Sequence, residues 1–194
     1  MNAAPDIAPP YIGRFAPSPT GPLHFGSLVA ALGSWLDARA AAGRWLVRME
    51  DLDRPRCVPG AADTILRQLE SYGLVWDGEV LAQSSRDAAY ESALQQLRQS
   101  GAAYRCVCTR SQLSDAPRNA QGETIYPGTC RNGMADAHTP HAWRVRAPEE
   151  VIRFTDRVWG GITQSVATDV GDFVVKRADG LFAYQLAVVV DDAY

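Results

Sequence analysis

The stretch that most constrains the fold is RFAPSPTGPLHFGSL, residues 14–28, in which three prolines and two glycines stand within a single turn. Residues 11–16, which overlap the start of this stretch, are predicted to be a short strand. Residues 26–42, which begin at the end of the stretch, have apolar residues at helical spacing and are predicted to be a helix. Gly43 follows them as a natural helix stop. RWLVRME, residues 44–50, predicts a second strand. A strand, a helix and a strand in this order form a βαβ unit, with parallel strands and a right-handed crossover.

In an open α/β sheet, ligands bind at the carboxyl ends of the strands, and a helix N-terminus at that place favours phosphate. Gly21 and Gly26 would let a ligand approach the backbone, while the prolines stiffen the loop. His24 could donate a hydrogen bond to a phosphate oxygen, and Ser27 could cap the helix or do the same. A rigid strand-to-helix turn without a ligand is the alternative that the pattern leaves open.

The rest of the chain divides by periodicity. Residues 61–72 and 86–100 are predicted to be amphipathic helices, whereas 103–141 lacks steady periodicity and holds three of the four cysteines. Strand-like runs follow in residues 142–147, 151–158, 162–168 and 173–177. The apolar run at 182–194 fits a strand or a helix. Because the sequence stops within that run, we expect a C-terminally truncated chain.

Charge and hydropathy narrow the class of protein. The net charge of −3 means that contact with nucleic acid would depend on a local patch. The sequence has no apolar stretch long enough for a membrane helix and no secretory signal at its start, which predicts a cytoplasmic protein without membrane contact. In that compartment the cysteines are expected to be metal ligands or buried thiols rather than disulfides.

The cysteine-bearing segment reads CVC at 106–108 and YPGTCRN at 126–132. Three thiolates and one phenolate could supply the four ligands that zinc prefers, but spacing alone leaves zinc and inert buried thiols equally open. Cys57 stands apart and is expected to be an ordinary thiol.

Three blocks carry a family resemblance: the 14–28 stretch with His24-Phe25-Gly26-Ser27, RMEDLDRPR at 48–56, and GDFVVKRADGLFAYQLAVVVDDAY at 171–194. Together they resemble the glutamyl subgroup of the class I aminoacyl-tRNA synthetases. The resemblance implies an α/β, Rossmann-like catalytic domain with a parallel sheet and a small zinc-bearing insertion. The implied division is a disordered lead (1–10), the first half of the catalytic domain (11–102), the zinc-binding insertion (103–141), and the remaining insertion with the start of the second half (142–194).

Three segments are most similar in sequence to a shortened paralogue within this subgroup: HFGSL, EDLDRPR and ADGLFAYQLAVVVDD. Such paralogues activate L-glutamate with ATP in the absence of tRNA, and attach it to queuosine, the modified wobble base of tRNA(Asp). A monomer is expected. The alternatives are the catalytic fragment of a glutamyl-tRNA synthetase and a non-catalytic, zinc-bearing binding module. A lysine-rich ATP loop and a further pocket arginine of the family lie beyond residue 194, which leaves the activity of this chain open.

The resemblance also assigns site residues. It implies catalytic roles for His24 and Ser27. It implies one structural zinc per chain, and magnesium that arrives with ATP. The implied glutamate contacts are Arg14, Phe15, Ala16, Pro17, Ser18, Glu50 and Tyr184; the ATP contacts are Pro17, Gly21, His24, Phe25, Gly26 and Ser27; and the zinc ligands are Cys106, Cys108, Tyr126 and Cys130.

Acidic residues in the second block, Glu50, Asp51 and Asp53, could suggest a magnesium site of their own. Arginines at 48, 54 and 56 surround them, and this arrangement favours an ion-paired network instead. Magnesium would then be held mainly by the ATP phosphates and water.

Overall fold

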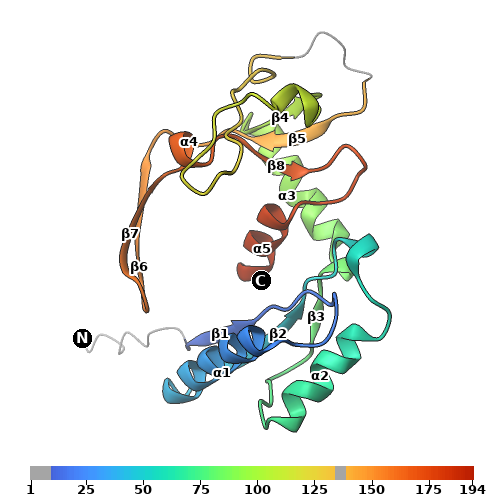
Figure 1. Ribbon diagram of the computed structural model, residues 1–194, viewed down its shortest axis with the longest axis vertical. Coiled ribbons are helices and arrows are strands. Elements are labelled where there is room, and N and C mark those ends of the chain that lie inside the picture. Colours follow the sequence, from blue (N-terminus) through green and yellow to red (C-terminus); the bar gives the residue numbers. More distant parts are fainter. Residues whose placement is uncertain (1–9, 134–138) are drawn as a thin grey trace, which may run out of the picture. The chain divides into compact units, whose positions relative to one another are not determined.

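The computed structural model describes residues 10–133 and 139–194. The chain divides into two compact units, residues 1–86 and 87–194, and each is described by itself (Figure 1). Apart from Pro10, the lead predicted over residues 1–10 lies outside the described residues.

The first unit is built on the predicted βαβ arrangement. Strand β1 (Ile12–Phe15) leads through the proline-rich loop into helix α1 (Phe25–Ala40), and β2 (Arg44–Met49) returns parallel to β1. A short strand, β3 (Leu81–Ala82), extends the parallel sheet in the order β1-β2-β3. Helix α2 (Ala61–Ser71) and the 3₁₀ turns η1 (Arg54–Arg56) and η2 (Gln83–Ser85) complete the unit. The predicted strand–helix–strand order is therefore confirmed.

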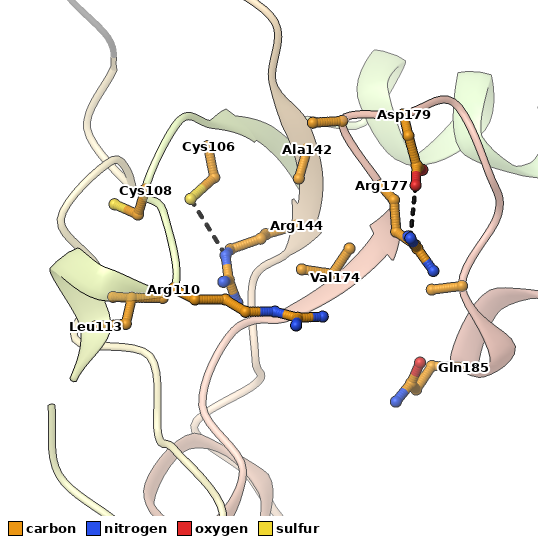
Figure 2. Close-up of a pocket in the computed structure, with 12 residues that line it drawn as sticks. Cys106, Cys108, Arg110, Leu113, Ala142, Arg144, Val174, Arg177, Asp179 and Gln185 are labelled. Carbon is orange, nitrogen blue, oxygen red and sulfur yellow. Dashed lines mark hydrogen bonds and ion pairs between the residues drawn. The ribbon is translucent and has the colours of Figure 1, made fainter.

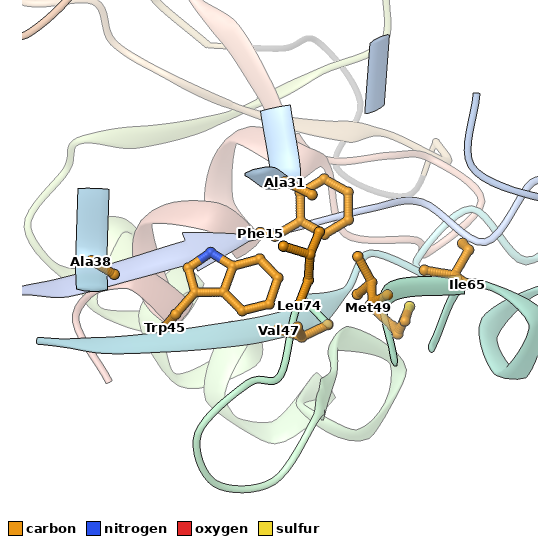
Figure 3. Close-up of a cluster of buried hydrophobic side chains, with 9 residues drawn as sticks. Phe15, Ala31, Ala38, Trp45, Val47, Met49, Ile65 and Leu74 are labelled. Carbon is orange, nitrogen blue, oxygen red and sulfur yellow. The ribbon is translucent and has the colours of Figure 1, made fainter. Parts of the chain in front are cut away.

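The core of the first unit lies where α1 and α2 pack on the sheet (Figure 3). Trp45 is fully buried, and its indole N–H donates to Ser34 Oγ at 2.9 Å. Phe15 stacks against it with ring centroids 6.3 Å apart. These contacts fix α1 against the sheet, and with it the loop that enters α1. The remaining buried members are Ala31, Ala38, Val47, Met49, Ile65, Leu69 and Leu74.

Gly43, between α1 and β2, is a position where only a hydrogen fits. A Cβ built there would lie 2.3 Å from the carbonyl oxygen of Tyr11, which already accepts the backbone N–H of Arg44. We expect Gly43→Ala to lower the free energy of unfolding by about 1–3 kcal/mol, the usual cost of overpacking. Gly33→Ala is the control, because a Cβ at this exposed α1 position meets nothing within 4 Å and should stabilise the helix by about 1 kcal/mol. Urea denaturation measures both, and equal stabilities would contradict the packing argument.

The second unit holds an antiparallel sheet of order β4-β5-β8. Its strands are β4 (Ala103–Cys106), β5 (Ala142–Val145) and β8 (Phe173–Lys176), and helix α3 (Asp87–Gln99) precedes them. The hairpin of β6 (Val151–Asp156) and β7 (Gly160–Ser165) leads into the short helix α4 (Val166–Asp169), and η3 (Ser111–Leu113) follows β4. The sheet joins strands from both sides of the segment 107–141, while the domain boundaries at 102 and 141 stay a prediction.

The ambiguous apolar run at the end of the sequence forms a helix, α5 (Tyr184–Asp192). Leu186 and Ala187 are buried on it. The hydroxyl of Tyr90 on α3 donates to the Asp191 carboxylate at 2.8 Å, and the same ring packs edge-on against Phe182. These contacts tie α5 to α3.

No helix in the described part of the chain is both long enough and apolar enough to cross a bilayer.

Candidate active site and metal-binding cluster

The proline-rich loop of the first unit is tied down at three places. The carbonyl of Pro17 accepts the backbone N–H of Glu50 at 2.9 Å, and the carbonyl of Pro19 accepts that of Val58 at 2.9 Å. The N–H of Leu23 donates to the Gln68 side chain on α2 at 2.8 Å. Hydrogen bonds to the end of β2 and to two later segments, one of them through the Gln68 side chain, therefore hold the loop in one shape.

His24 is the N-cap residue of α1. Its Nδ1 accepts the backbone N–H of Ser27 at 3.1 Å, and its Nε2 lies 3.0 Å from Ser27 Oγ. Because Nδ1 is an acceptor, the proton of the neutral ring belongs on Nε2. A Cβ at position 26 would lie 3.2 Å from two atoms of the imidazole, so glycine leaves room for the ring. His24 and Ser27 thus form one polar pair at the positive end of a sixteen-residue helix.

A pocket of about 400 Å³ opens beside this pair. It brings together seven of the residues predicted for glutamate or ATP. Phe25 and Gly26 begin α1 as exposed residues and do not line this pocket. Thr20, Pro22, Leu23, Ala30 and Ile65 complete the lining, and no ligand contact was assigned to them from the sequence. The seven predicted residues are Phe15, Ala16, Pro17, Ser18, Gly21, His24 and Ser27.

The two charged residues predicted for glutamate lie at the ends of adjacent parallel strands, outside the lining of this pocket. Arg14 is half-buried on β1, and alternation along the strand places its side chain on the face opposite Phe15. Glu50 follows β2, and its Oε1 accepts from Arg48 Nη2 at 3.0 Å. Tyr184 is the first residue of α5 in the second unit and is 54% exposed. A shared glutamate pocket for these three residues stays a prediction.

The acidic residues after β2 are engaged with neighbouring side chains. Besides the Arg48–Glu50 pair, Asp53 accepts from Arg56 at 2.6 Å. Asp51 differs from the predicted ion pairing, because its carboxylate accepts the backbone N–H and the hydroxyl of Ser84 at 2.8 and 2.6 Å. Among the described residues, the geometry suited to a metal ion occurs at the cysteine cluster and not here.

Cys57 follows this acidic segment. Its thiol is half-buried and donates to backbone carbonyls of Asp51 and Asp53. Burial and the two aspartates raise the pKa of the thiol, which favours its protonated form.

The second unit brings all four predicted zinc ligands together. The sulphurs of Cys106, Cys108 and Cys130 lie within 4.8 Å of one another, with 3.6 Å between those of Cys108 and Cys130. The Tyr126 hydroxyl is 3.3 Å from Cys106 Sγ and 3.4 Å from Cys108 Sγ. In a tetrahedral site, bond lengths of about 2.3 Å to sulphur and 2.0 Å to oxygen place sulphurs about 3.8 Å apart and oxygen about 3.5 Å from sulphur. The four side chains therefore fit a zinc ion with little movement.

Burial shapes the acid–base state of the cluster. It raises the pKa of the Tyr126 phenol well above its usual range, and the neighbouring thiols add to that effect. Burial also raises the pKa of Cys108. For Cys130 the desolvation cost is outweighed by hydrogen bonds from Tyr126 and a backbone N–H, so its pKa is lowered. A cation that bound here would displace protons from these groups.

Two residues that sequence reasoning did not single out support the cluster. Asp172 is buried and accepts two hydrogen bonds from Arg131 at 2.9 Å each, one from Tyr104 and one from the Ala147 N–H. Burial alone would raise the pKa of Asp172, but these donors lower it below its ordinary value. Arg144 on β5 donates from Nε to Cys106 Sγ at 3.3 Å, as Figure 2 shows. Arg144 follows the cysteine-bearing segment 103–141, and Asp172 lies further along the chain, so neither belongs to the C-x-C or Tyr-x-x-x-Cys motif.

Residues 12–194 match the family described as tRNA synthetases class I (E and Q), catalytic domain. The chain belongs to this family. The predicted α/β class I synthetase fold with a parallel sheet is thereby confirmed.

Among these class I synthetases, the chain is 70% identical over 183 residues to glutamyl-Q tRNA(Asp) synthetase of Thiobacillus denitrificans, covering 94% of this chain and 61% of the relative. It is 59% identical over 187 residues to the protein of the same name from Dechloromonas aromatica, covering 95% of this chain and 62% of the relative. The predicted similarity to the shortened paralogue is confirmed. The chain spans about three fifths of the length of these relatives.

Two solved structures of glutamate-specific tRNA ligases are also similar. A glutamate tRNA ligase from Elizabethkingia meningosepticum, in complex with its amino acid, superposes with a TM-score of 0.79 at 28% identity, over 94% of this chain and 41% of the other. The glutamate-tRNA synthetase of Elizabethkingia anophelis gives 0.81 at 28% identity, over 95% of this chain and 42% of the other.

Proposed function

We propose that the chain takes part in the ATP-dependent activation of L-glutamate to glutamyl-adenylate, independently of tRNA, and in the transfer of glutamate to queuosine in tRNA(Asp). The observation that carries the proposal is the pocket at the start of α1, where a fixed loop presents the His24–Ser27 pair and the helix N-terminus. Relatives at 57–70% identity named glutamyl-Q tRNA(Asp) synthetase supply the substrate class.

In the first step, an oxygen of the glutamate α-carboxylate attacks the α-phosphorus of ATP, and the bond to the departing pyrophosphate breaks. His24 Nε2–H and the positive end of α1 stabilise the charge that develops on the phosphate oxygens. Arg14 pairs with a substrate carboxylate through its planar guanidinium, and Glu50 holds the ammonium. Loop residues 16–18 position the substrate. In the second step, a hydroxyl of the queuosine ring attacks the glutamyl carbonyl, the bond from this carbonyl to the phosphate breaks, AMP leaves, and the hydroxyl proton is released to solvent.

The test is glutamate-dependent exchange of pyrophosphate into ATP without tRNA, run on this chain and in parallel on the Thiobacillus relative. Exchange by the chain alone would support the proposal. A silent chain beside an active relative would overturn it for this chain. Exchange that requires glutamate tRNA would instead favour a glutamyl-tRNA synthetase, the activity named for the solved structures at 28% identity. Transfer of labelled glutamate to tRNA(Asp) with and without queuosine then tests the acceptor.

We also propose that the cluster of Cys106, Cys108, Tyr126 and Cys130 binds one structural zinc ion. Support comes from the fit of the four side chains to tetrahedral spacing. Four protein ligands leave no open position for a substrate, so the ion would stabilise the segment between β4 and β5 and would take no part in the chemistry.

Removal of zinc is expected to destabilise the second unit. At free zinc a hundredfold above the dissociation constant, the ion contributes about 2.7 kcal/mol, and a chelator should remove that contribution. Elemental analysis should find one zinc per chain, lost in Cys130→Ser and kept in Cys57→Ser, because Cys57 lies outside the cluster. Zinc-free wild-type protein with unchanged thermal stability in chelator would contradict the metal proposal.

A further inference from the structure

Arg144 makes two contacts to the metal-binding cluster and a third that holds its guanidinium in place. Its Nε donates to Cys106 Sγ at 3.3 Å, and its guanidinium carbon lies 3.9 Å from the centroid of the Tyr126 ring. Its Nη1 donates to the backbone carbonyl of Asp172 at 2.7 Å, which fixes the plane of the group. One guanidinium therefore touches two of the four predicted ligands at once.

The charge of an occupied cluster makes these contacts significant. Zinc with three thiolates carries a net charge of −1, and deprotonation of Tyr126 would make it −2. Cys106, Cys130 and Tyr126 are at most 6% exposed, so water screens this charge poorly. The nearby Asp172 carboxylate is already matched by Arg131. Arg144 brings a positive charge into direct contact with two of the ligands, where it can offset the excess negative charge.

The shape of the surroundings favours arginine at this position. Its planar fork can donate to a sulphur and a carbonyl while its face covers an aromatic ring, whereas a lysine ammonium cannot do all three. Cys106, Cys108 and Arg144 also line a pocket of about 600 Å³ (Figure 2).

We propose that Arg144 is a positioning residue for the metal: it holds Cys106 and Tyr126 in their ligating orientations and neutralises part of the charge of the occupied cluster. The inference rests on the zinc site proposed above. It assigns to a residue of β5, outside the cysteine-bearing segment, a direct share in metal affinity.

The test measures zinc affinity by competition with a chromophoric chelator. Arg144→Met keeps the length and apolar character of the side chain but removes the charge and the donors. We expect its zinc affinity to fall by about 10–100-fold, the usual effect of losing an outer partner of a metal ligand. Arg144→Lys restores the charge alone and should lie between wild type and Arg144→Met.

Arg146→Met is the matched control. Arg146 also donates to backbone carbonyls, at 2.6 Å to Arg131 and 3.2 Å to Gly101, and also faces an aromatic ring, that of Tyr104. None of these interactions is with a predicted ligand. If the loss of zinc affinity came only from lost packing and hydrogen bonds, both variants would therefore lose it alike. Its zinc affinity should equal that of the wild type.

Cobalt(II) in place of zinc provides the second readout. The thiolate-to-cobalt absorption should keep its intensity in saturated Arg144→Met, since the thiolates themselves are unchanged. Equal zinc affinities for wild type and Arg144→Met would overturn the inference, as would an equal loss in Arg146→Met. If Arg144→Met did not fold, the comparison would rest on Arg144→Lys. A zinc affinity of Arg144→Lys equal to that of the wild type would then overturn the inference. A wild type that binds neither metal would overturn both this inference and the metal proposal.

Discussion

Replacing His24 by asparagine is expected to lower the rate of glutamate-dependent pyrophosphate exchange by about 10²–10³-fold, the typical effect of removing one donor aimed at developing charge. Asparagine is among the best N-cap residues, so it can still accept the backbone N–H that His24 Nδ1 accepts from Ser27. What it lacks is the second ring nitrogen beside Ser27 Oγ. The variant thus distinguishes the role of His24 in capping α1 from its proposed role in stabilising charge during the reaction.

The comparison needs one stability measurement and one control. The midpoint of urea unfolding should be nearly unchanged in His24→Asn, whereas His24→Ala should lose about 1 kcal/mol as well as activity, because alanine cannot cap. His141→Ala removes a histidine of the second unit that hydrogen-bonds its own loop, and it should retain exchange activity. A folded His24→Asn protein with wild-type exchange would show that His24 only caps the helix.

The first unit was predictable because its signals are local. Three local signals predict β1, α1 and β2 without long-range information. They are apolar residues at helical spacing, a glycine at the end of the helix, and a strand-like segment on each side of it. The place of His24 and Ser27 at the start of α1 follows from the same pattern. The hydrogen bonds that tie the loop to Gln68 and Val58 could not be predicted, since those partners lie on segments whose packing depends on the whole core.

The end of the chain shows the opposite case. LAVVVDD is apolar throughout its first part, and such a run fits a buried strand as well as a buried helix. The helix is stabilised by Tyr90, whose hydroxyl bonds to Asp191 across 101 residues of sequence. Tertiary contacts of this range leave no mark on local periodicity.

The metal-binding cluster was half predictable. The C-x-C pair and the Tyr-x-x-x-Cys segment identified all four side chains that the structure brings together. The charged residues beside them are Arg144, which contacts Cys106, and Asp172, whose carbonyl accepts from Arg144; they come from β5 and from the turn before β8. An isolated arginine or aspartate is usually a solvated charge, so only the fold reveals that these two are structural.

Replacing Asp172 by asparagine is expected to destabilise the second unit by about 3 kcal/mol, the low end of the cost of removing one partner from a buried ion pair, because the carboxylate is buried while Arg131 is 38% exposed. Both carboxylate oxygens are used: Oδ1 accepts from Arg131 and the Ala147 N–H, and Oδ2 accepts from Arg131 and the Tyr104 hydroxyl. An amide keeps one acceptor oxygen and turns an NH₂ group toward the remaining donors. Arg131 would also keep its charge without a matching anion.

Asp179→Asn is the matched control. Asp179 also accepts from an arginine, Arg177 at 2.5 Å, but both side chains are nearly half exposed. Exposed pairs contribute little, so this variant should lose at most about 1 kcal/mol. Equal losses in the two variants would show that burial does not govern the Asp172 network.

The dependence on pH gives an independent check of the same network. The folded pKa of Asp172 lies below its ordinary value, because Tyr104, the Ala147 N–H and Arg131 together outweigh the desolvation that would raise it. A lowered folded pKa gives stability that is fully present above the unfolded value of about 3.9 and is lost as pH falls through the folded value. The stability difference between wild type and Asp172→Asn should therefore be constant from neutral pH to about pH 5 and shrink below pH 4. Urea unfolding at a series of pH values measures it, and a difference that stayed constant down to pH 3 would show that the carboxylate charge does not hold this unit together.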